Sequence, residues 1–197
     1  MMHAEVIQIA KKLSEMTLAE LWQLFPIILT APDPRWPDWY AQEEDLLRSV
    51  LPPAFKAGIH HIGSTSISGI WAKPIVDILV EAAPDTSLAQ ADEHLLQAGY
   101  RCMSRETERR SYNKGYTEEG FAEEVFHLHL VHAGEQPEIL FRDYLNTHPE
   151  DAKAYEALKL SLWKPYEHDR DGYTRAKTSF VKEILQRAKE ENAAMDR

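Results

Sequence analysis

The residues best suited to bind phosphate lie in one short stretch of the chain, between Gly63 and Asp77. Gly63 lets another group approach the backbone closely, because it has no side chain. Ser64 and Thr65 follow it with hydroxyl and backbone N–H groups at the expected start of a short helix, which is a natural place for a phosphate. Twelve residues separate Ser64 from Asp77, whose carboxylate could hold Mg²⁺ or Mn²⁺ against phosphate groups. The alternative role of Ser64 is a plain helix N-cap.

Two histidines share one face of a second strand-like segment, residues 125–131. Its even-numbered residues are apolar and predict a core face, so His127 and His129 point the opposite way. If this strand neighbours that of Asp77, the three side chains form a candidate metal site, whose imidazoles favour a transition metal over Mg²⁺. Binding through His129 would then weaken below about pH 6.5, because only neutral imidazole binds a metal. The alternative is that both histidines are half-buried and hydrogen-bonded to the backbone.

Basic residues near these segments could meet a phosphate, Arg through its planar fork and Lys as a point charge. Lys73 is the best placed, since it lies between the Gly-Ser turn and Asp77. We also expect Arg142, Arg170 and Lys177 at the site. The alternative for the two arginines is an ion pair with an adjacent aspartate, in a chain whose 32 acidic residues outnumber its 22 basic ones.

The elements that must position these residues follow from the spacing of apolar residues and turn residues. A strand at about 56–62 leads into the Gly-Ser turn, and a strand at about 74–81 carries Asp77. Further strands are expected at 100–104 and 109–116, and the acidic residues 117–124 predict a turn. Helical patterns cover residues 3–29, with a break near Met16, and then 38–50, 84–98, 136–147, 150–164 and 172–191.

This alternation of strands and helices predicts an α/β (α+β) fold. We expect a small mixed sheet with helices packed on one side of it and further helices at both ends of the chain. Residues 1–30 would form an N-terminal helical extension. Residues 31–197 would form the main domain, with its C-terminal helices starting at about residue 136.

The bulk composition limits the classes of function. A net charge of −10 and a pI near 5.4 argue against a nucleic-acid partner, which requires a basic surface. The single cysteine, Cys102, cannot form an internal disulfide, and the sequence starts without the pattern of a secretory signal peptide. No apolar run is long enough to cross a bilayer. We therefore expect a cytoplasmic protein without a nucleic-acid or membrane partner, and the sequence leaves its oligomeric state open.

The wording of several segments resembles the GrpB family (UPF0157-type), within the nucleotidyltransferase superfamily of polymerase β-like fold. The first segment contains Gly-Ser-Thr, Gly69, Lys73-Pro74 and Asp77. Further segments that are similar to the family follow in the same order, namely His127–Val131, Phe141–Leu145, Tyr155–Lys159 and Asp169–Lys177. The resemblance runs from about Asp33 to Glu183.

The resemblance implies a nucleotidyltransferase-like mixed sheet and a pocket for a nucleotide or another phosphorylated small molecule. In such a site Gly63 and Ser64 would hold the β- and γ-phosphates, Asp77 the metal, and His129 would be a third ligand or a base. The superfamily usually places two acids one residue apart on the second strand, but here Ile75 and Leu79 occupy both possible positions. Asp77 therefore stands alone, which departs from the usual two-metal arrangement.

Three functions remain open from the sequence. The first is a metal-dependent nucleotidyltransferase that uses Asp77 and His129. The second is a non-catalytic protein that binds a nucleotide or a coenzyme A-related compound, since GrpB domains can occur joined to a dephospho-coenzyme A kinase domain. The third is an accessory protein that binds a partner through the hydrophobic surface of its N-terminal helices, Leu18 to Leu29.

Overall fold

The computed structural model describes residues 11–195 and contains one five-stranded sheet with the strand order β1-β2-β5-β4-β3. The two central strands, β2 and β5, run parallel, and every other neighbouring pair is antiparallel. The sheet is therefore mixed, as predicted. Its strands are β1 (Gly58–Ile62), β2 (Val76–Ala82), β3 (Arg101–Arg105), β4 (Arg109–Thr117) and β5 (Gly120–His132).

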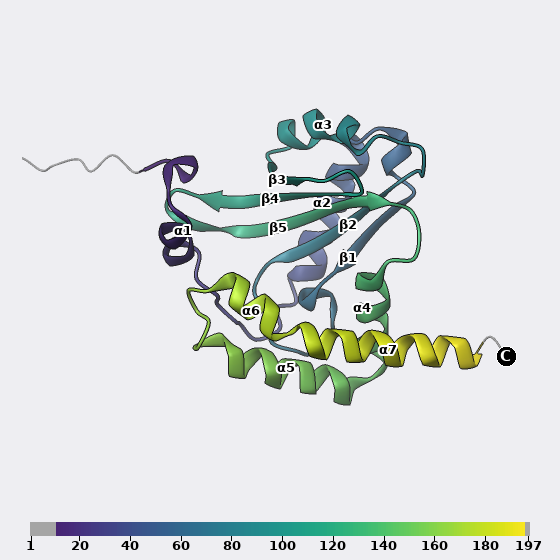
Figure 1. Ribbon diagram of the computed structural model, residues 1–197. Coiled ribbons are helices and arrows are strands. Elements are labelled where there is room, and N and C mark those ends of the chain that lie inside the picture. Colours follow the sequence, from purple (N-terminus) through teal and green to yellow (C-terminus); the bar gives the residue numbers. More distant parts are fainter. Residues whose placement is uncertain (1–10, 196–197) are drawn as a thin grey trace, which may run out of the picture.

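Helices cover both faces of the sheet, whereas we predicted helices on one side only (Figure 1). Helices α2 and α3 pack on one face, and the helices that follow β5 pack over the other. The helices are α1 (Leu18–Leu24), α2 (Trp36–Val50), α3 (Asp92–Gln97), α4 (Pro137–Thr147), α5 (Pro149–Trp163), α6 (Arg170–Ala176) and α7 (Thr178–Met195). Short 3₁₀ turns are η1 (Leu13–Glu15), η2 (Pro53–Phe55), η3 (Ser64–Ser66) and η4 (Leu88–Ala91).

The main core lies between the sheet and helix α2. The even-numbered residues of β2 and those at 126, 128 and 130 of β5, such as Ile78 and Leu128, are buried there. They pack against Trp36 and Leu47 of α2 in one hydrophobic cluster. This arrangement confirms the face that the alternation in residues 125–131 predicted for the core, and it turns the odd-numbered residues to the other face.

A second hydrophobic cluster fixes the C-terminal helices. Ile67 and Ile70, in the loop after η3, pack with Leu145 of α4, Tyr155 of α5 and Ile184 of α7. These helices are thus held by the loop that follows the Gly-Ser turn. On the opposite face of the sheet, Leu79 and Val131 pack against Ile139 of α4, whereas Asp77, His127 and His129 border an open space beneath the helices.

The N-terminal segment begins its first α-helix at the capping box that the sequence predicts. The Thr17 hydroxyl accepts a hydrogen bond from the backbone N–H of Glu20 at 3.3 Å, and the Glu20 carboxylate accepts one from the backbone N–H of Thr17 at 2.6 Å. After α1, Phe25 packs against Tyr116 and Phe121 of the β4–β5 hairpin, with ring centroids 4.7 and 5.1 Å apart. The first part of the helix predicted for residues 3–29 lies outside the described residues.

The predicted acidic turn over 117–124 is shorter in the structure. Thr117 pairs with Gly120, so the turn comprises residues 118 and 119 only, and residues 120–124 belong to β5. The sequence does not alternate in this part because the hairpin tip extends beyond the core. A bulge at Gly115 bends the hairpin there, and a Cβ at this residue would lie 2.2 Å from the carbonyl oxygen of Glu124.

The single helix predicted for residues 172–191 is two helices. Helix α6 begins at Arg170, because the Asp169 carboxylate accepts a hydrogen bond from the backbone N–H of Gly172 at 2.8 Å and caps the helix. It ends at Ala176, and α7 starts at Thr178. Lys177, in the connection, directs its side chain toward the sheet face that carries Asp77.

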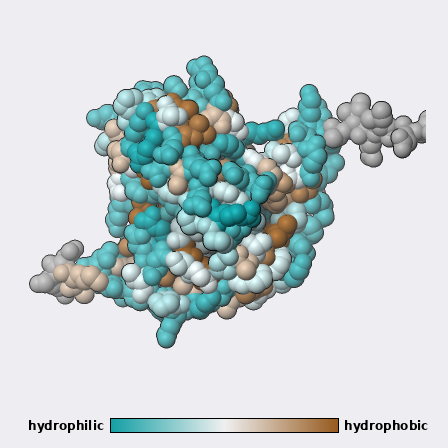
Figure 2. All heavy atoms as spheres, turned by 180° about the vertical axis from the view of Figure 1, so that it is seen from behind, coloured by the Kyte–Doolittle hydropathy of each residue, from teal (hydrophilic) through white to brown (hydrophobic). Residues whose placement is uncertain are grey.

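The surface opposite to the view of Figure 1 is mostly hydrophilic, with hydrophobic residues in small separate patches (Figure 2). Within residues 11–195, no helix combines the length and the apolar composition that crossing a membrane requires.

Candidate functional site

A cavity of about 530 Å³ lies between the odd-numbered face of β2 and β5 and the C-terminal helices α4 to α7. It brings together most of the residues that the sequence marked as a site, although these come from strands, a turn and helices far apart in the chain. The predicted residues that line it are Gly63, Ser64, Lys73, Asp77, His127, His129, Arg170 and Lys177.

The parallel register of β2 and β5 places Asp77 directly beside His127. Asp77 Oδ1 lies 3.1 Å from His127 Nδ1, and Arg170 Nη2 lies 3.1 Å from His127 Nε2. Because a guanidinium can only donate, Nε2 accepts, and Nδ1 carries the proton that it donates to Asp77. Burial lowers the pKa of His127 despite the adjacent carboxylate, so the imidazole is neutral. Both ring nitrogens of His127 are therefore in use.

Asp77 is held as a carboxylate. Burial raises its pKa, but the hydrogen bond from His127 and the positive charges around it outweigh burial and bring the pKa to about 2. Its second oxygen, Oδ2, lies against the backbone of Gly63, where an added Cβ would come within 2.2 Å of it. Gly63 also has φ +72° and ψ −171°, a backbone conformation almost restricted to glycine. The glycine thus makes room for the carboxylate at the cavity floor.

Three lysines converge on the cavity from the loop before β2, from α5 and from the end of α6. Burial and the nearby charges of Arg170 and Lys177 lower the pKa of Lys73 to about 7. Burial, with Lys177 and Lys73 nearby, lowers the pKa of Lys159 to about 7 as well. Burial lowers the pKa of Lys177 to about 8. The cavity thus holds several positive charges that repel one another and lie out of water.

Lys159 was missed at the sequence level. It is 2% exposed, and its ammonium group donates to the carbonyl oxygen of Trp71. It also lies 4.8 Å above the ring of Tyr155, one helical turn earlier on α5. Its position in the GrpB-like segment Tyr155–Lys159, between Leu158 and Leu160, was the available signal.

Tyr173 is the aromatic wall of the lysine cluster. The ammonium groups of Lys177 and Lys73 lie 4.4 and 5.8 Å from its ring centroid. The side chain is 1% exposed, and its hydroxyl has no hydrogen-bond partner. Tyr173 and Lys177 lie on the same side of the cavity.

The other end of the cavity carries His129 and an ion pair. Burial lowers the pKa of His129 to about 4. The imidazole therefore takes up a proton near pH 4 and not near the predicted pH 6.5. Ser111 Oγ is 3.4 Å from His129 Nδ1. Arg109 Nη1 donates to Glu138 Oε1 at 2.7 Å, and the second oxygen of Glu138 is buried without a partner. Sequence reasoning missed Glu138, because nothing in α4 marks it as different from a solvated acid.

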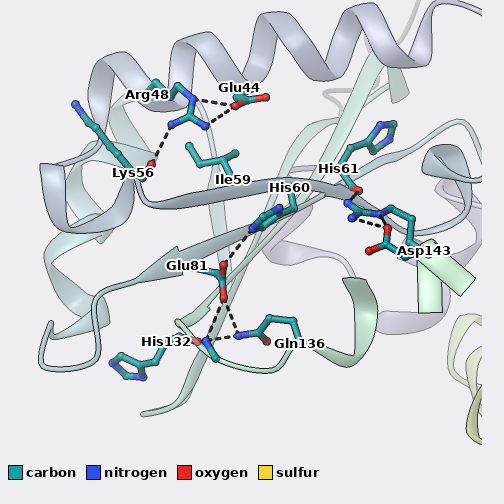
Figure 3. Close-up of polar contacts among 12 residues, drawn as sticks. Glu44, Arg48, Lys56, Ile59, His60, His61, Glu81, His132, Gln136 and Asp143 are labelled. Carbon is teal, nitrogen blue, oxygen red and sulfur yellow. Dashed lines mark hydrogen bonds and ion pairs between the residues drawn. The ribbon is translucent and has the colours of Figure 1, made fainter. Parts of the chain in front are cut away.

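Two predicted site residues are not on the cavity. The Thr65 hydroxyl donates to the carbonyl oxygen of Ile75 at 3.1 Å and lies 3.0 Å from His61 Nε2, so it joins the ends of β1 and β2. Arg142 donates to the carbonyl oxygen of His61 at 2.8 Å and pairs with Asp143 at 2.7 Å (Figure 3). The polar groups of both side chains thus bind other groups of the protein.

The residues present do not fit a resident metal held by Asp77, His127 and His129. In the described part of the chain, no group of three or more His, Cys, Asp or Glu side chains is arranged to hold a metal ion. Both ring nitrogens of His127 already have partners within the protein, Nδ1 with Asp77 and Nε2 with Arg170 and Tyr116, so neither is free to bind a metal. The lysines around them oppose a dication by like-charge repulsion.

The chain belongs to the GrpB family. The model of this family, described as GrpB protein, matches residues 26–187. The UPF0157 protein PA4798 of Pseudomonas aeruginosa is 36% identical over 79% of this chain and 65% of the relative. The glutamate-rich protein GrpB of Alkalihalophilus pseudofirmus is 36% identical over 81% of this chain and 94% of the relative. A dephospho-CoA kinase of Mycolicibacterium paratuberculosis is 27% identical over 93% of this chain. This chain spans 65% and 50% of the lengths of the first and last of these relatives.

A solved structure of the same family agrees with this assignment. The crystal structure of the conserved protein GrpB from Enterococcus faecalis is similar with a TM-score of 0.72 and 28% identity, over 84% of this chain and 99% of that chain. The Cid1 poly(U) polymerase is similar with a TM-score of 0.47 and 14% identity, over 73% of this chain and 44% of that chain. A similarity with a TM-score of 0.47 gives no information about activity.

Proposed function

We propose that the cavity binds a phosphorylated small molecule, either a nucleotide or a coenzyme A-related compound. The observation that carries this proposal is the convergence of Lys73, Lys159 and Lys177 on one buried space. Buried lysines are costly unless an anion offsets their charge. Arg170 adds a guanidinium on the same side of the cavity, and its fork suits phosphate oxygens.

The form of the ligand follows from the balance of charge. The acids on the cavity are Asp77 and Glu138, and each already interacts with a neighbour, His127 and Arg109 respectively. The remaining positive charge favours a polyanion. The similarity to a protein named dephospho-CoA kinase supports a coenzyme A-related phosphate as one candidate.

The geometry favours binding over nucleotidyl transfer. Transfer of the usual kind requires paired acids that hold metal ions, and Asp77 has no such partner on β2 or β5. The donor set does not fit a metal, so we derive no catalytic step. Of the functions left open by the sequence, binding without transfer is therefore the one we propose.

The test is calorimetry with inorganic phosphate, ADP, ATP and coenzyme A on the wild type and two lysine variants. Lys177→Ala removes a cavity charge and should weaken binding of every phosphorylated probe by about tenfold or more. Lys182→Ala removes an exposed lysine from α7 and should leave the affinity unchanged. Folded protein that binds none of the probes, or equal affinities for both variants, would contradict the proposal.

A further inference from the structure

Two residues that line the cavity, Tyr173 and Glu138, each carry a buried polar atom that has no hydrogen-bond partner within the protein. These atoms are the hydroxyl of Tyr173 and Oε2 of Glu138. Five such side-chain atoms occur among residues 11–195, and two of the five belong to this one cavity. Because native proteins pair nearly all their buried polar groups, this concentration points to a ligand that supplies the missing partners.

The hydroxyl of Tyr173 requires an acceptor. Its ring lies between Lys73 and Lys177, and burial strongly raises the pKa of the phenol, so the hydroxyl keeps its proton. The two groups over its ring, the ammonium groups of Lys73 and Lys177, only donate while they are protonated. An anionic oxygen of a ligand beside these lysines would satisfy the hydroxyl and the ammonium groups together.

Glu138 requires the opposite kind of partner. Its Oε1 accepts from Arg109, and as a carboxylate its Oε2 can only accept as well. A phosphate oxygen at this position would be repelled. The partner that fits is an N–H or O–H group of the ligand.

The two groups lie at different ends of the cavity. Arg109, the partner of Glu138, is opposite Val131 on the sheet, beyond His129. Arg170, one turn before Tyr173 on α6, contacts His127. The ends are thus separated by at least the spacing of the two histidines, about 7 Å along the strand.

We propose that the ligand is bipartite, with its phosphate bound at Tyr173 and the exocyclic amino group of a nucleotide base bound at Glu138. This rests on the proposed function and narrows its substrate class. A nucleotide whose base carries an exocyclic amino group has both features at a suitable separation. Inorganic phosphate and small phosphate esters have the anionic end alone.

This inference can be tested by calorimetry with two nucleotides, one of which has the donor group while the other lacks it. The probes are ADP and purine riboside 5′-diphosphate, which lacks the 6-amino group. The wild type should bind ADP about tenfold more tightly, as expected for one hydrogen bond to a charged group. Glu138→Gln should abolish most of this preference, and Glu135→Gln, which changes an exposed acid nearby, should keep it.

Tyr173→Phe tests the other end. Removal of the hydroxyl should weaken both probes by a similar factor while the melting temperature stays the same or rises, because the group lacks a partner in the free protein. Equal affinities of the wild type for the two probes would overturn the bipartite ligand, and so would an unchanged affinity in Tyr173→Phe. If Lys177→Ala still weakens binding in that case, the proposed function stands; if neither probe binds at all, both proposals fail.

Discussion

The carboxylate of Asp77 occupies the space that a side chain at residue 63 would need. A Cβ on Gly63 would lie 2.2 Å from Asp77 Oδ2 and 2.9 Å from its Cβ and Cγ. The turn after β1 and the acid of β2 are therefore fitted to one another. This contact explains why the glycine and the aspartate, although separated by fourteen positions in the chain, form one unit of the site.

Gly63→Ala should destabilise the fold and displace Asp77. The backbone conformation alone costs about 1–3 kcal/mol for a residue with a side chain, and the clash adds to it. We expect a lower free energy of unfolding in urea and weaker binding of ADP. Gly69→Ala is the matched control, because it also changes a glycine with positive φ but has open space around it. An equal loss of binding in the two variants would show that the contact with Asp77 is unimportant.

Asp77→Asn should reduce stability in a pH-dependent way. The pKa of Asp77 is about 2 in the folded protein, below its ordinary value of 3.8, so its contribution is present above pH 4 and is lost as the pH falls toward 2. A shift of this size corresponds to about 2 kcal/mol. The wild type should therefore exceed the variant in stability by about 2 kcal/mol at pH 6, and the difference should disappear near pH 2. A difference that is constant over this range would contradict a charged Asp77.

Thr65→Val should separate a structural role from a binding role. The hydroxyl of Thr65 is buried and joins Ile75 to His61, so its loss should cost about 1–3 kcal/mol of stability. The affinity for ADP should not change, because the side chain does not line the cavity. Ser64→Ala, at the neighbouring position on the cavity, should show the reverse. A loss of affinity in Thr65→Val at unchanged stability would restore Thr65 to the site.

Much of the sheet face could be predicted from the sequence. The alternation in residues 125–131 determines which residues are buried, and burial determines the face to which His127 and His129 belong. The expected closeness of Asp77 to these histidines required only that β2 and β5 be neighbours, which the register shows.

The helical wall of the cavity could not be predicted in the same way. Lys159 and Glu138 are ordinary charged residues within helical segments, and only the docking of α4 and α5 on the loop after η3 turns them inward. Thr65 and Arg142 have the chemistry of phosphate ligands, but the same groups also bind backbone carbonyls, and tertiary contacts alone decide between these roles.

Proton uptake on binding tests the central claim, that the lysine cluster binds phosphate, most directly. At pH 8 the lysines with a pKa of about 7 or 8 are partly neutral, and an anion beside them raises the pKa and draws protons onto them. The phosphates of ADP are already ionised at this pH. Calorimetry at pH 8 in buffers of different ionisation enthalpy should therefore show net proton uptake, and the affinity should fall as the pH rises further. Binding without proton exchange, or with proton release, would contradict the account.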